Sequence, residues 1–235
     1  MNKKFWNWIK DSEQENVLRL DGVIAEDSWF DDDVTPAAFR AELESHPGDV
    51  IVWINSPGGD VFAGAQIYNM LMEHKGNVTV RIDGLAASAA SVIAMAGSTV
   101  EMSPVSTMMI HNPWTMAVGD ENEMKATIDM LKEIKESIIN AYELKTGLSR
   151  DKISKLMDGD TFMNARKALD LGFADRIMYA DNEQHDDDGI DAMMFSRAAV
   201  MNSLCDSLRK KHKSQEPDNR IPADIMRKRL SLLSK

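Results

Sequence analysis

A strand–helix–strand pattern between residues 50 and 82 constrains the fold of this chain more than any other feature. Residues 50–55 (VIVWIN) and 78–82 (VTVRI) have the apolar, β-branched composition of short strands. Between them, apolar residues recur at three- and four-residue spacing from Val61 to Met72, as in an amphipathic helix. Such a βαβ unit implies a parallel sheet covered by helices. The sequence therefore predicts an α/β fold.

Further elements are expected on both sides of this unit. In chain order they are a strand at 17–24, a helix at 35–44, a helix of small residues at 86–96, strands at 98–102 and 106–111, and helices at 121–145, 150–157 and 164–172. The strands at 98–102 and 106–111 are expected to pair with each other. The longest helix carries one apolar stripe opposite its charges, and this stripe needs a large apolar partner. Its residues are Met124, Ile128, Leu131, Ile134, Ile138 and Tyr142.

Charge divides the chain into three parts. Residues 181–189 (DNEQHDDDG) are acidic and almost free of apolar residues, so they are expected to link a core domain, 1–180, to a tail, 190–235. The whole chain has a net charge of −11, but from Arg197 onward ten Lys and Arg face only four Asp and Glu. An acidic body does not attract nucleic acid, and the basic tail is interpreted as solvated amphipathic helices.

Several classes of protein and site are not expected. The single cysteine, Cys205, cannot form an intramolecular disulfide, which favours a reducing, cytoplasmic compartment. The N-terminal residues MNKKFWNWIK lack the continuous apolar run of a signal peptide, and no stretch is long and apolar enough to cross a bilayer. His185 and the aspartates beside it lie in the linker, which provides no preorganised geometry for a cation. No metal and no cofactor are therefore expected.

Three segments have the residue types that a nucleophilic enzyme needs. His111 ends an apolar strand (MMIH), where side chains become accessible and a general base can act. The SPGGD segment, residues 56–60, is a glycine turn that leads into a helix and can present N–H groups to an anion. Ser88, in GLAASAAS, starts a helix, and the N–H of Ala89 follows it as an oxyanion donor would. Each segment taken alone is also compatible with an ordinary turn, cap or strand end.

Together, INSPGG, GLAASAAS, MMIHNP and GDTFMNARKALDLGFAD resemble the Clp protease proteolytic subunit, the ClpP family of serine peptidases, over residues 17–180. The resemblance implies that Ser88 is the nucleophile, His111 the base and Asp160 the residue that orients the base. Gly59 and Ala89 then supply the backbone N–H groups of the oxyanion hole. Asp160 is preferred to its neighbour Asp158 because TFMNA follows it, as in the family. The implied fold is ClpP/crotonase-like, with repeated ββα units and a protruding long handle helix.

The resemblance also implies homo-oligomeric rings, of seven subunits or stacked in pairs, that act on polypeptide substrates. The N-terminal sequence FWNWIKDSEQEN, the acidic linker and the basic tail differ from the housekeeping subunit. These departures resemble head-maturation proteases of phages and prophages, so the expected function is ATP-independent processing of capsid or scaffold proteins in the host cytoplasm or at the prohead.

Other readings of the chain remain open. One is a proteolytic subunit that works with an AAA+ unfoldase, and another is an inactive capsid-assembly scaffold with the same fold. A crotonase-like acyl-CoA enzyme and a Ser-Lys peptidase that uses Lys75 are further alternatives.

Overall fold

A computed structural model describes residues 4–10, 16–24 and 35–180 of the chain. Within these ranges eight strands form one mixed sheet, in the order β1-β2-β3-β4-β5-β8, with β6 and β7 continuing from β4. The strands are β1 (Trp6–Lys10), β2 (Asn16–Asp21), β3 (Val50–Ser56), β4 (Val78–Ala87), β5 (Thr99–Met102), β6 (Thr107–Ile110), β7 (Thr161–Asn164) and β8 (Arg176–Ile177). The α/β prediction is confirmed. The predicted linker and tail lie outside the described residues.

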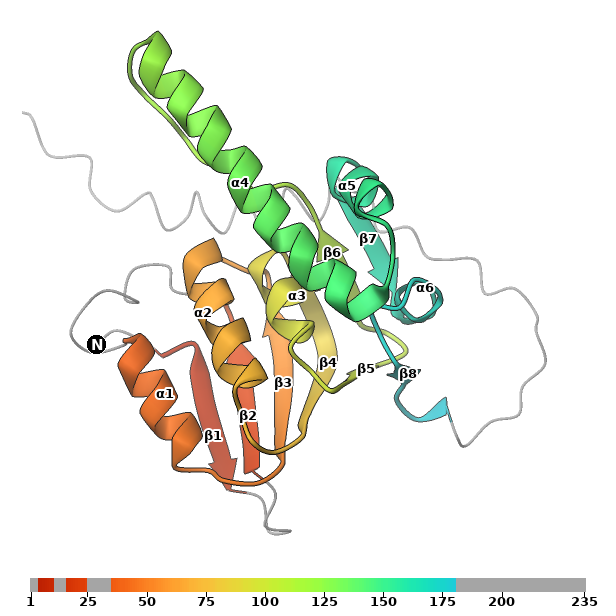
Figure 1. Ribbon diagram of the computed structural model, residues 1–235. Coiled ribbons are helices and arrows are strands. Elements are labelled where there is room, and N and C mark those ends of the chain that lie inside the picture. Colours follow the sequence, from red (N-terminus) through yellow and green to blue (C-terminus); the bar gives the residue numbers. More distant parts are fainter. Residues whose placement is uncertain (1–3, 11–15, 25–34, 181–235) are drawn as a thin grey trace, which may run out of the picture. The chain divides into compact units, whose positions relative to one another are not determined.

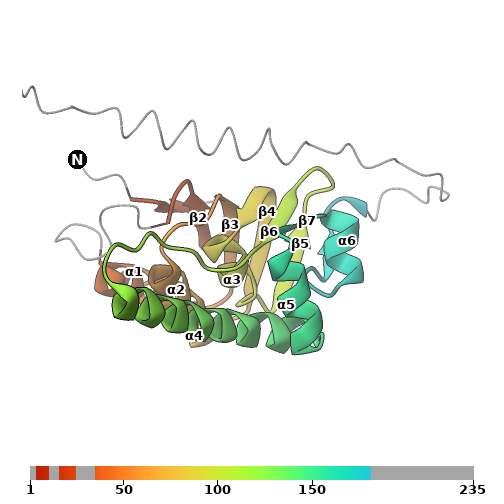
Figure 2. The same ribbon diagram turned by 90° about the horizontal axis from the view of Figure 1, so that it is seen from above.

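Six helices in the described ranges pack against this sheet. They are α1 (Pro36–Glu44), α2 (Val61–Met72), α3 (Ala89–Ala94), α4 (Glu121–Thr146), α5 (Arg150–Asp158) and α6 (Ala165–Asp170). Helices α1, α2 and α4 lie on one side of the strands, and α5 and α6 lie at the β7 end (Figures 1 and 2). Their ends follow local chemistry: Thr35 and Asn164 cap the N–H groups of α1 and α6, and Gly147 ends α4 with the left-handed φ of 67°.

Strand β4 is longer than the sequence suggests and changes partner along its length. Its first half pairs with β5, from Thr79–Thr99 to Ile82–Met102, and its second half pairs with β6, from Leu85–Thr107 to Ala87–Met109. Two predictions are therefore wrong. The helix expected from residue 86 begins at Ala89, and the strands near 98–102 and 106–111 each pair with β4 rather than with each other. The cause is tertiary: pairing with β6 keeps Ala86 and Ala87 extended despite their helical preference.

The first half of β4 contributes to a row of interacting side chains that crosses five strands. In register, Arg19, Trp53, Arg81, Glu101 and Arg176 lie side by side on β2, β3, β4, β5 and β8. Arg81 lies over the Trp53 ring and donates to Glu101 at 2.8 Å. Arg176 Nε donates to the same carboxylate at 2.7 Å. This row joins the strands by cross-strand ion pairs and a cation–π contact.

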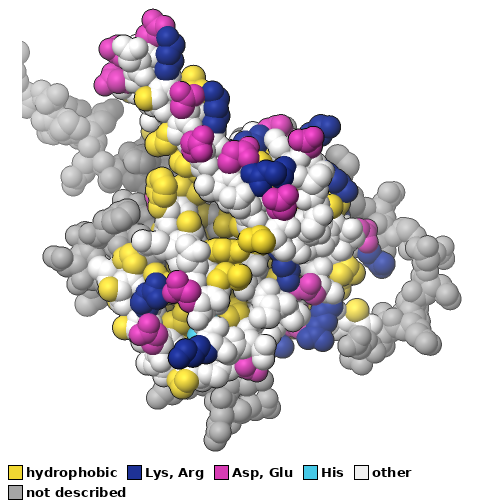
Figure 3. Space-filling view, in the orientation of Figure 1, with side chains coloured by type: hydrophobic (Ala, Val, Ile, Leu, Met, Phe, Trp, Pro, Cys, Tyr) yellow, Lys and Arg dark blue, Asp and Glu magenta, His cyan; other side chains and the backbone are white. Residues whose placement is uncertain are grey.

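Helix α4 has a buried end and an exposed end. Near its C-terminus Ile138, Ile139 and Tyr142 are buried in the core. Nearer its N-terminus Ile128 and Met130 are 52% and 44% exposed, and this end extends beyond the sheet beside residues 112–120 (Figure 1). Among the described residues, only the C-terminal part of the predicted apolar stripe is therefore buried against a partner. In Figure 3, apolar side chains gather between α4 and the α2–α3 region.

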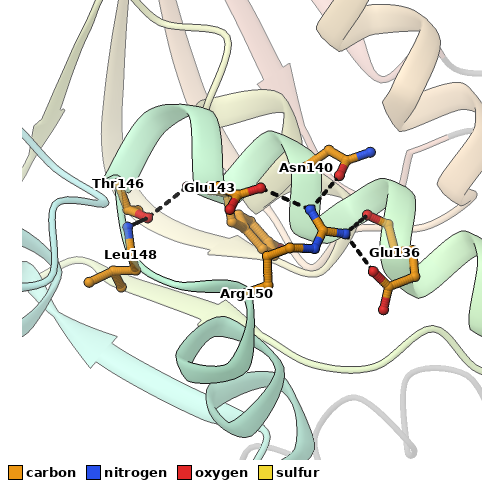
Figure 4. Close-up of polar contacts among 7 residues, drawn as sticks. Glu136, Asn140, Glu143, Thr146, Leu148 and Arg150 are labelled. Carbon is orange, nitrogen blue, oxygen red and sulfur yellow. Dashed lines mark hydrogen bonds and ion pairs between the residues drawn. The ribbon is translucent and has the colours of Figure 1, made fainter.

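The buried end of α4 is fixed to α5 by one arginine. Arg150, the first residue of α5, donates to the side chains of Asn140 at 2.7 Å and Glu143 at 2.8 Å, and it also pairs with Glu136 (Figure 4). All three acceptors lie on one face of α4, at three- and four-residue spacing. The guanidinium thus links the start of α5 to one face of α4.

Candidate active site

Strand register brings three predicted site residues to one place. Ser88 directly follows β4, and its N–H donates to the carbonyl of Met109 on β6 at 3.0 Å. His111 directly follows β6, and Asp160 directly precedes β7. Strands β6 and β7 are antiparallel and their last pair is Ile110–Thr161, so the next pair in that register is His111 and Asp160. Strand β4 and the antiparallel pair β6–β7 therefore bring the Ser88 hydroxyl, the His111 imidazole and the Asp160 carboxylate to one end of the sheet.

Ser88 has a strained backbone that frees its hydroxyl. Its φ and ψ are 56° and −126°, a region that non-glycine residues adopt at a cost of about 1–3 kcal/mol. It occupies the N-cap position of α3, yet its side chain caps no N–H group of that helix. The ordinary explanation of a serine at a helix start, capping, therefore does not apply here. Asp160 also has a positive φ, of 45°.

The Ser88 hydroxyl instead contacts the predicted base. Its Oγ lies 2.7 Å from His111 Nε2, and both residues are partly buried. Burial lowers the pKa of His111 below its ordinary value, while the Asp160 carboxylate opposes this shift and raises it. The imidazole is therefore neutral at pH 7, and Nε2 is able to accept the Ser88 proton.

Asp158 and Asp160, two residues apart, have separate surroundings. The exposed Asp158 carboxylate accepts hydrogen bonds from Lys135 of α4 at 2.6 Å and from Asn112 at 2.9 Å. Asp160 acts electrostatically on His111. The choice of Asp160 as the orienting carboxylate remains a prediction, and the contacts of Asp158 join α4 to the residue after His111.

The glycine turn lies directly against Ser88. A Cβ on Gly58 would come within 2.6 Å of both Ser88 Cβ and the carbonyl oxygen of Ala87, so only glycine fits there. The N–H of Gly58 is bonded to Ser56 Oγ at 3.1 Å.

Gly59 is exposed, and a parallel bridge to Ile24 orients it. Ile24 donates to the carbonyl of Gly58 and accepts from the N–H of Asp60, at 2.8 and 3.0 Å. Since the bridge uses the groups on either side of Gly59, its own N–H points away from Ile24.

Ala89 supplies the second predicted N–H. It is the first residue of α3, and the first N–H groups of a helix have no partner within that helix. The Gly58 Cα is also close to it, because a Cβ there would lie 3.0 Å from the Ala89 nitrogen. The predicted donors Gly59 and Ala89 therefore lie on neighbouring segments: Ala89 directly follows Ser88, and Gly59 directly follows Gly58, which packs against Ser88.

Sequence reasoning missed two buried hydrogen-bond contacts behind Ser88. Ser91 is fully buried; its hydroxyl donates to the Ser88 carbonyl at 2.6 Å and lies 2.8 Å from the hydroxyl of Tyr142. The sequence shows Ser91 one helical turn after Ser88 and Tyr142 on the apolar stripe, but the contact joins residues 51 positions apart. Local patterns give no signal for such a contact.

Other kinds of site have no support in the described residues. The described ranges contain no group of three or more His, Cys, Asp or Glu side chains arranged to hold a metal ion. In the same ranges no helix is long and apolar enough to cross a bilayer. His185 and its neighbouring aspartates lie outside the described residues. Lys75 follows the end of α2 that is remote from the glycine turn, whereas Ser88 already contacts a histidine.

Known proteins are similar to this chain in sequence. A family model described as Clp protease matches residues 14–181. The ATP-dependent Clp protease proteolytic subunit of Bacteroides fragilis (strain ATCC 25285) is 33% identical over 154 residues, covering 63% of this chain and 74% of the relative. The ATP-dependent Clp protease proteolytic subunit 1 of Chlamydia abortus is 34% identical over 144 residues, covering 59% of this chain and 75% of the relative.

Proposed function

Because the chain belongs to the Clp protease family and is thus a serine-type peptidase, we propose that it hydrolyses polypeptides as the proteolytic subunit of an ATP-dependent protease. Ser88 is the nucleophile, His111 the general base and Asp160 the carboxylate that orients the base. The observation that carries this proposal is the 2.7 Å contact between Ser88 Oγ and His111 Nε2 at the junction of β4, β6 and β7.

The chemistry follows from these positions. His111 takes the Ser88 proton as Oγ attacks the scissile carbonyl. The resulting oxyanion accepts hydrogen bonds from the N–H groups of Gly59 and Ala89. The imidazolium, stabilised by Asp160, then gives the proton to the leaving amine as the C–N bond breaks. A water molecule, deprotonated by His111, then attacks the acyl-enzyme. The ester bond to Ser88 breaks, the proton returns to Ser88 Oγ, and the second product is released. Each donor of an oxyanion hole is worth about 100- to 1000-fold in rate.

The direct test is Ser88→Ala, compared with Ser106→Ala. Both serines are replaced by the same residue, but Ser106 is buried and donates to the carbonyl of Ser103, outside the site. Ser88→Ala is expected to abolish peptide cleavage and labelling by a fluorophosphonate probe, while Ser106→Ala keeps both. Cleavage by purified Ser88→Ala at the wild-type rate would reject the proposed function.

The partner is proposed from the relatives. Those compared above are both named as ATP-dependent subunits, which favours an AAA+ unfoldase over the ATP-independent action expected from the sequence. Degradation of a folded reporter protein only when the host's AAA+ unfoldase and ATP are both present would support this assignment. Complete degradation of the folded reporter by the chain alone would contradict it.

Phage head maturation is the second candidate, and the acidic linker and basic tail are the observations that favour it. Cleavage of a capsid precursor at one site, without ATP, by the wild type but not by Ser88→Ala would support it over the unfoldase reading.

Assembly into homo-oligomeric rings is also part of the proposal. Residues 112–120 and the first half of α4 leave large apolar side chains exposed, and Val118 is 97% exposed. Exposed apolar surface of this kind is typical of protein interfaces. Light scattering of the purified chain tests this: a mass of several subunits is expected. A monomer at all accessible concentrations would reject the ring. Ile128→Glu is expected to lower the mass, and Ala126→Glu, at an exposed position on the opposite side of α4, is its control.

A further inference from the structure

The carbonyl of Ser88 accepts three hydrogen bonds. The N–H groups of Ser91 and Val92 donate to it at 2.9 and 3.4 Å, as the first turn of a helix requires. The Ser91 hydroxyl adds a third bond, the shortest of the three, at 2.6 Å. The oxygen is therefore held firmly from the α3 side, opposite the substrate side of Ser88.

The Ser91 hydroxyl is the middle of a chain of two hydrogen bonds. A serine hydroxyl has a single proton, and here it goes to the Ser88 carbonyl, so the Tyr142 hydroxyl must donate to Ser91 Oγ. Ser91 is 0% exposed and Tyr142 is 1% exposed, so no water competes. Burial raises the pKa of Tyr142, so the phenol stays protonated, and a donor, throughout the working pH range of a protease.

This chain ends on the peptide that contains an oxyanion donor. The Ser88 carbonyl and the Ala89 N–H belong to one planar trans peptide, so they point in opposite directions. Holding the carbonyl toward α3 therefore fixes the Ala89 N–H in the opposite direction, away from α3. Because the positive φ of Ser88 is not an orientation that the local backbone prefers, an external restraint is needed. Donors on the carbonyl also polarise the peptide and strengthen its N–H as a donor.

We propose that Ser91 and Tyr142 are positioning residues that aim the Ala89 N–H at the oxyanion of the reaction. The inference rests on the proposed function, since it assigns a role within the same site. Neither side chain touches the substrate, and both act through the peptide between Ser88 and Ala89. Tyr142 of α4 thereby influences the reaction at the end of β4 without contacting the substrate.

The test uses Ser91→Ala, Tyr142→Phe and the double variant of the full chain. Two quantities are measured: the hydrolysis of a short peptide ester, and inhibition by a peptide aldehyde, which forms a tetrahedral adduct with a catalytic serine. For Ser91→Ala we expect kcat to fall about tenfold to hundredfold with KM nearly unchanged, since the misaimed donor acts mainly in the transition state. The inhibition constant of the aldehyde is expected to rise by a similar factor.

The other variants and the pH profile distinguish a misaimed Ala89 N–H from a general loss of activity. Tyr142→Phe is expected to lower kcat by about threefold to tenfold, because the Ser91 bond remains but is no longer polarised. The double variant is expected to be no slower than Ser91→Ala, since both groups act along one chain. The acid limb of the pH profile is expected to stay in place, because the surroundings of His111 are unchanged.

Ser106→Ala and Tyr68→Phe are the matched controls. Ser106 makes the same kind of buried bond, to the carbonyl three residues earlier at 2.8 Å, and Tyr68 lies partly buried on α2. Both are expected to keep wild-type kcat. Tyr142→Phe removes only one oxygen and keeps its ring against Phe173, so it is expected to fold even where Ser91→Ala does not.

Two results would overturn the inference: wild-type kcat in folded Tyr142→Phe, or a fall in kcat with unchanged affinity for the aldehyde. Ser88→Ala is measured in parallel. If that variant remains active, the proposed function fails instead, so the two failures are distinguishable.

Discussion

The two halves of β4 show how one strand serves both stability and chemistry. From Val78 to Ile82 it pairs in unbroken register with β3 and β5, and its outward side chain Arg81 joins the row of charges that crosses the sheet. Beyond Ile82 the register with β3 shifts by two residues, and the Asn55 side chain bonds to the N–H of Leu85.

After this irregularity the strand continues beside β6 and ends in the strained Ser88. The comparison indicates that the regular half holds the sheet together, which allows the irregular half to keep an unfavourable backbone. Substitutions in the irregular half should therefore lower activity more than stability, and substitutions in the regular half should lower stability more than activity.

The largest effect is expected at the irregular end, for Asp160→Asn. Loss of the carboxylate is expected to lower kcat/KM by about 100- to 10,000-fold, because the imidazolium loses its stabilising charge. Burial lowers the pKa of His111 and Asp160 raises it, so removing Asp160 lowers that pKa further. Activity needs neutral His111, so the residual rate should reach half its maximum at a lower pH than in the wild type. A shift of this limb to higher pH would contradict the assignment.

Gly58→Ala tests the close packing beside Ser88, with Gly48→Ala as its control. Both glycines have a φ of 94°, so alanine is strained equally at either position. At Gly58 the new Cβ would also clash with Ala87 and Ser88, whereas at Gly48 no atom lies within 4 Å. We expect Gly58→Ala to lose about 100-fold or more in kcat, as for a lost oxyanion donor, and Gly48→Ala to lose only about 1 kcal/mol of stability. Equal activity in the two variants would show that the turn does not position the site.

Glu101→Gln tests the regular half. The Glu101 carboxylate is buried between Arg81 and Arg176, and we expect the neutral amide to lower the free energy of unfolding at pH 7 by about 2 kcal/mol. Peptide cleavage should stay close to the wild-type rate. A loss of activity without a loss of stability would reverse the roles assigned to the two halves.

The effect of Glu101 should also depend on pH. Burial raises the pKa of this carboxyl, but the hydrogen bonds from Arg81 and Arg176 outweigh burial and bring the pKa below its usual value. Its stabilisation is therefore present above the unfolded pKa of about 4.3 and is lost as the pH falls through the lower folded value. Urea unfolding of wild type and Glu101→Gln should differ at pH 7 and converge under strongly acidic conditions.

The smallest effect is expected for Asp158→Asn. Its ion pair with Lys135 is exposed, so the loss of stability should be below about 1 kcal/mol. The acid limb of the pH profile should stay in place, which makes this variant the control for Asp160→Asn. A shift as large as that of Asp160→Asn would mean that Asp158 also acts on the base.

The sequence predicted the elements that have a local signal. The apolar periodicity of residues 61–72 and 121–145 corresponds to α2 and α4 of the structure. Residue chemistry at strand ends likewise singled out Ser88 and His111, which the structure places in contact.

Features that depend on distant partners were not predictable in this way. The segment Gly84–Ala87 has little strand propensity, and pairing with β6 and with Ser56 of β3 keeps it extended. Strands β7 and β8, of four and two residues, are equally set by their neighbours. The contact between Ser91 and Tyr142 depends on the whole fold. So does the change of partner along β4, which pairs first with β5 and then with β6.

The bridge between Ile24 and Gly59 implies that the proposed oxyanion donor Gly59 and the proposed acid–base residues are held by different parts of the sheet. Ile24 follows β2 and fixes the peptides on either side of Gly59, whereas β6 and β7 hold His111 and Asp160. A small displacement of the chain after β2 would rotate the Gly59 amide and leave the Ser88–His111 hydrogen bond intact. Turnover would then fall while Ser88 stayed hydrogen-bonded to His111, so the position of this strand end is expected to affect the oxyanion step more than the activation of the nucleophile.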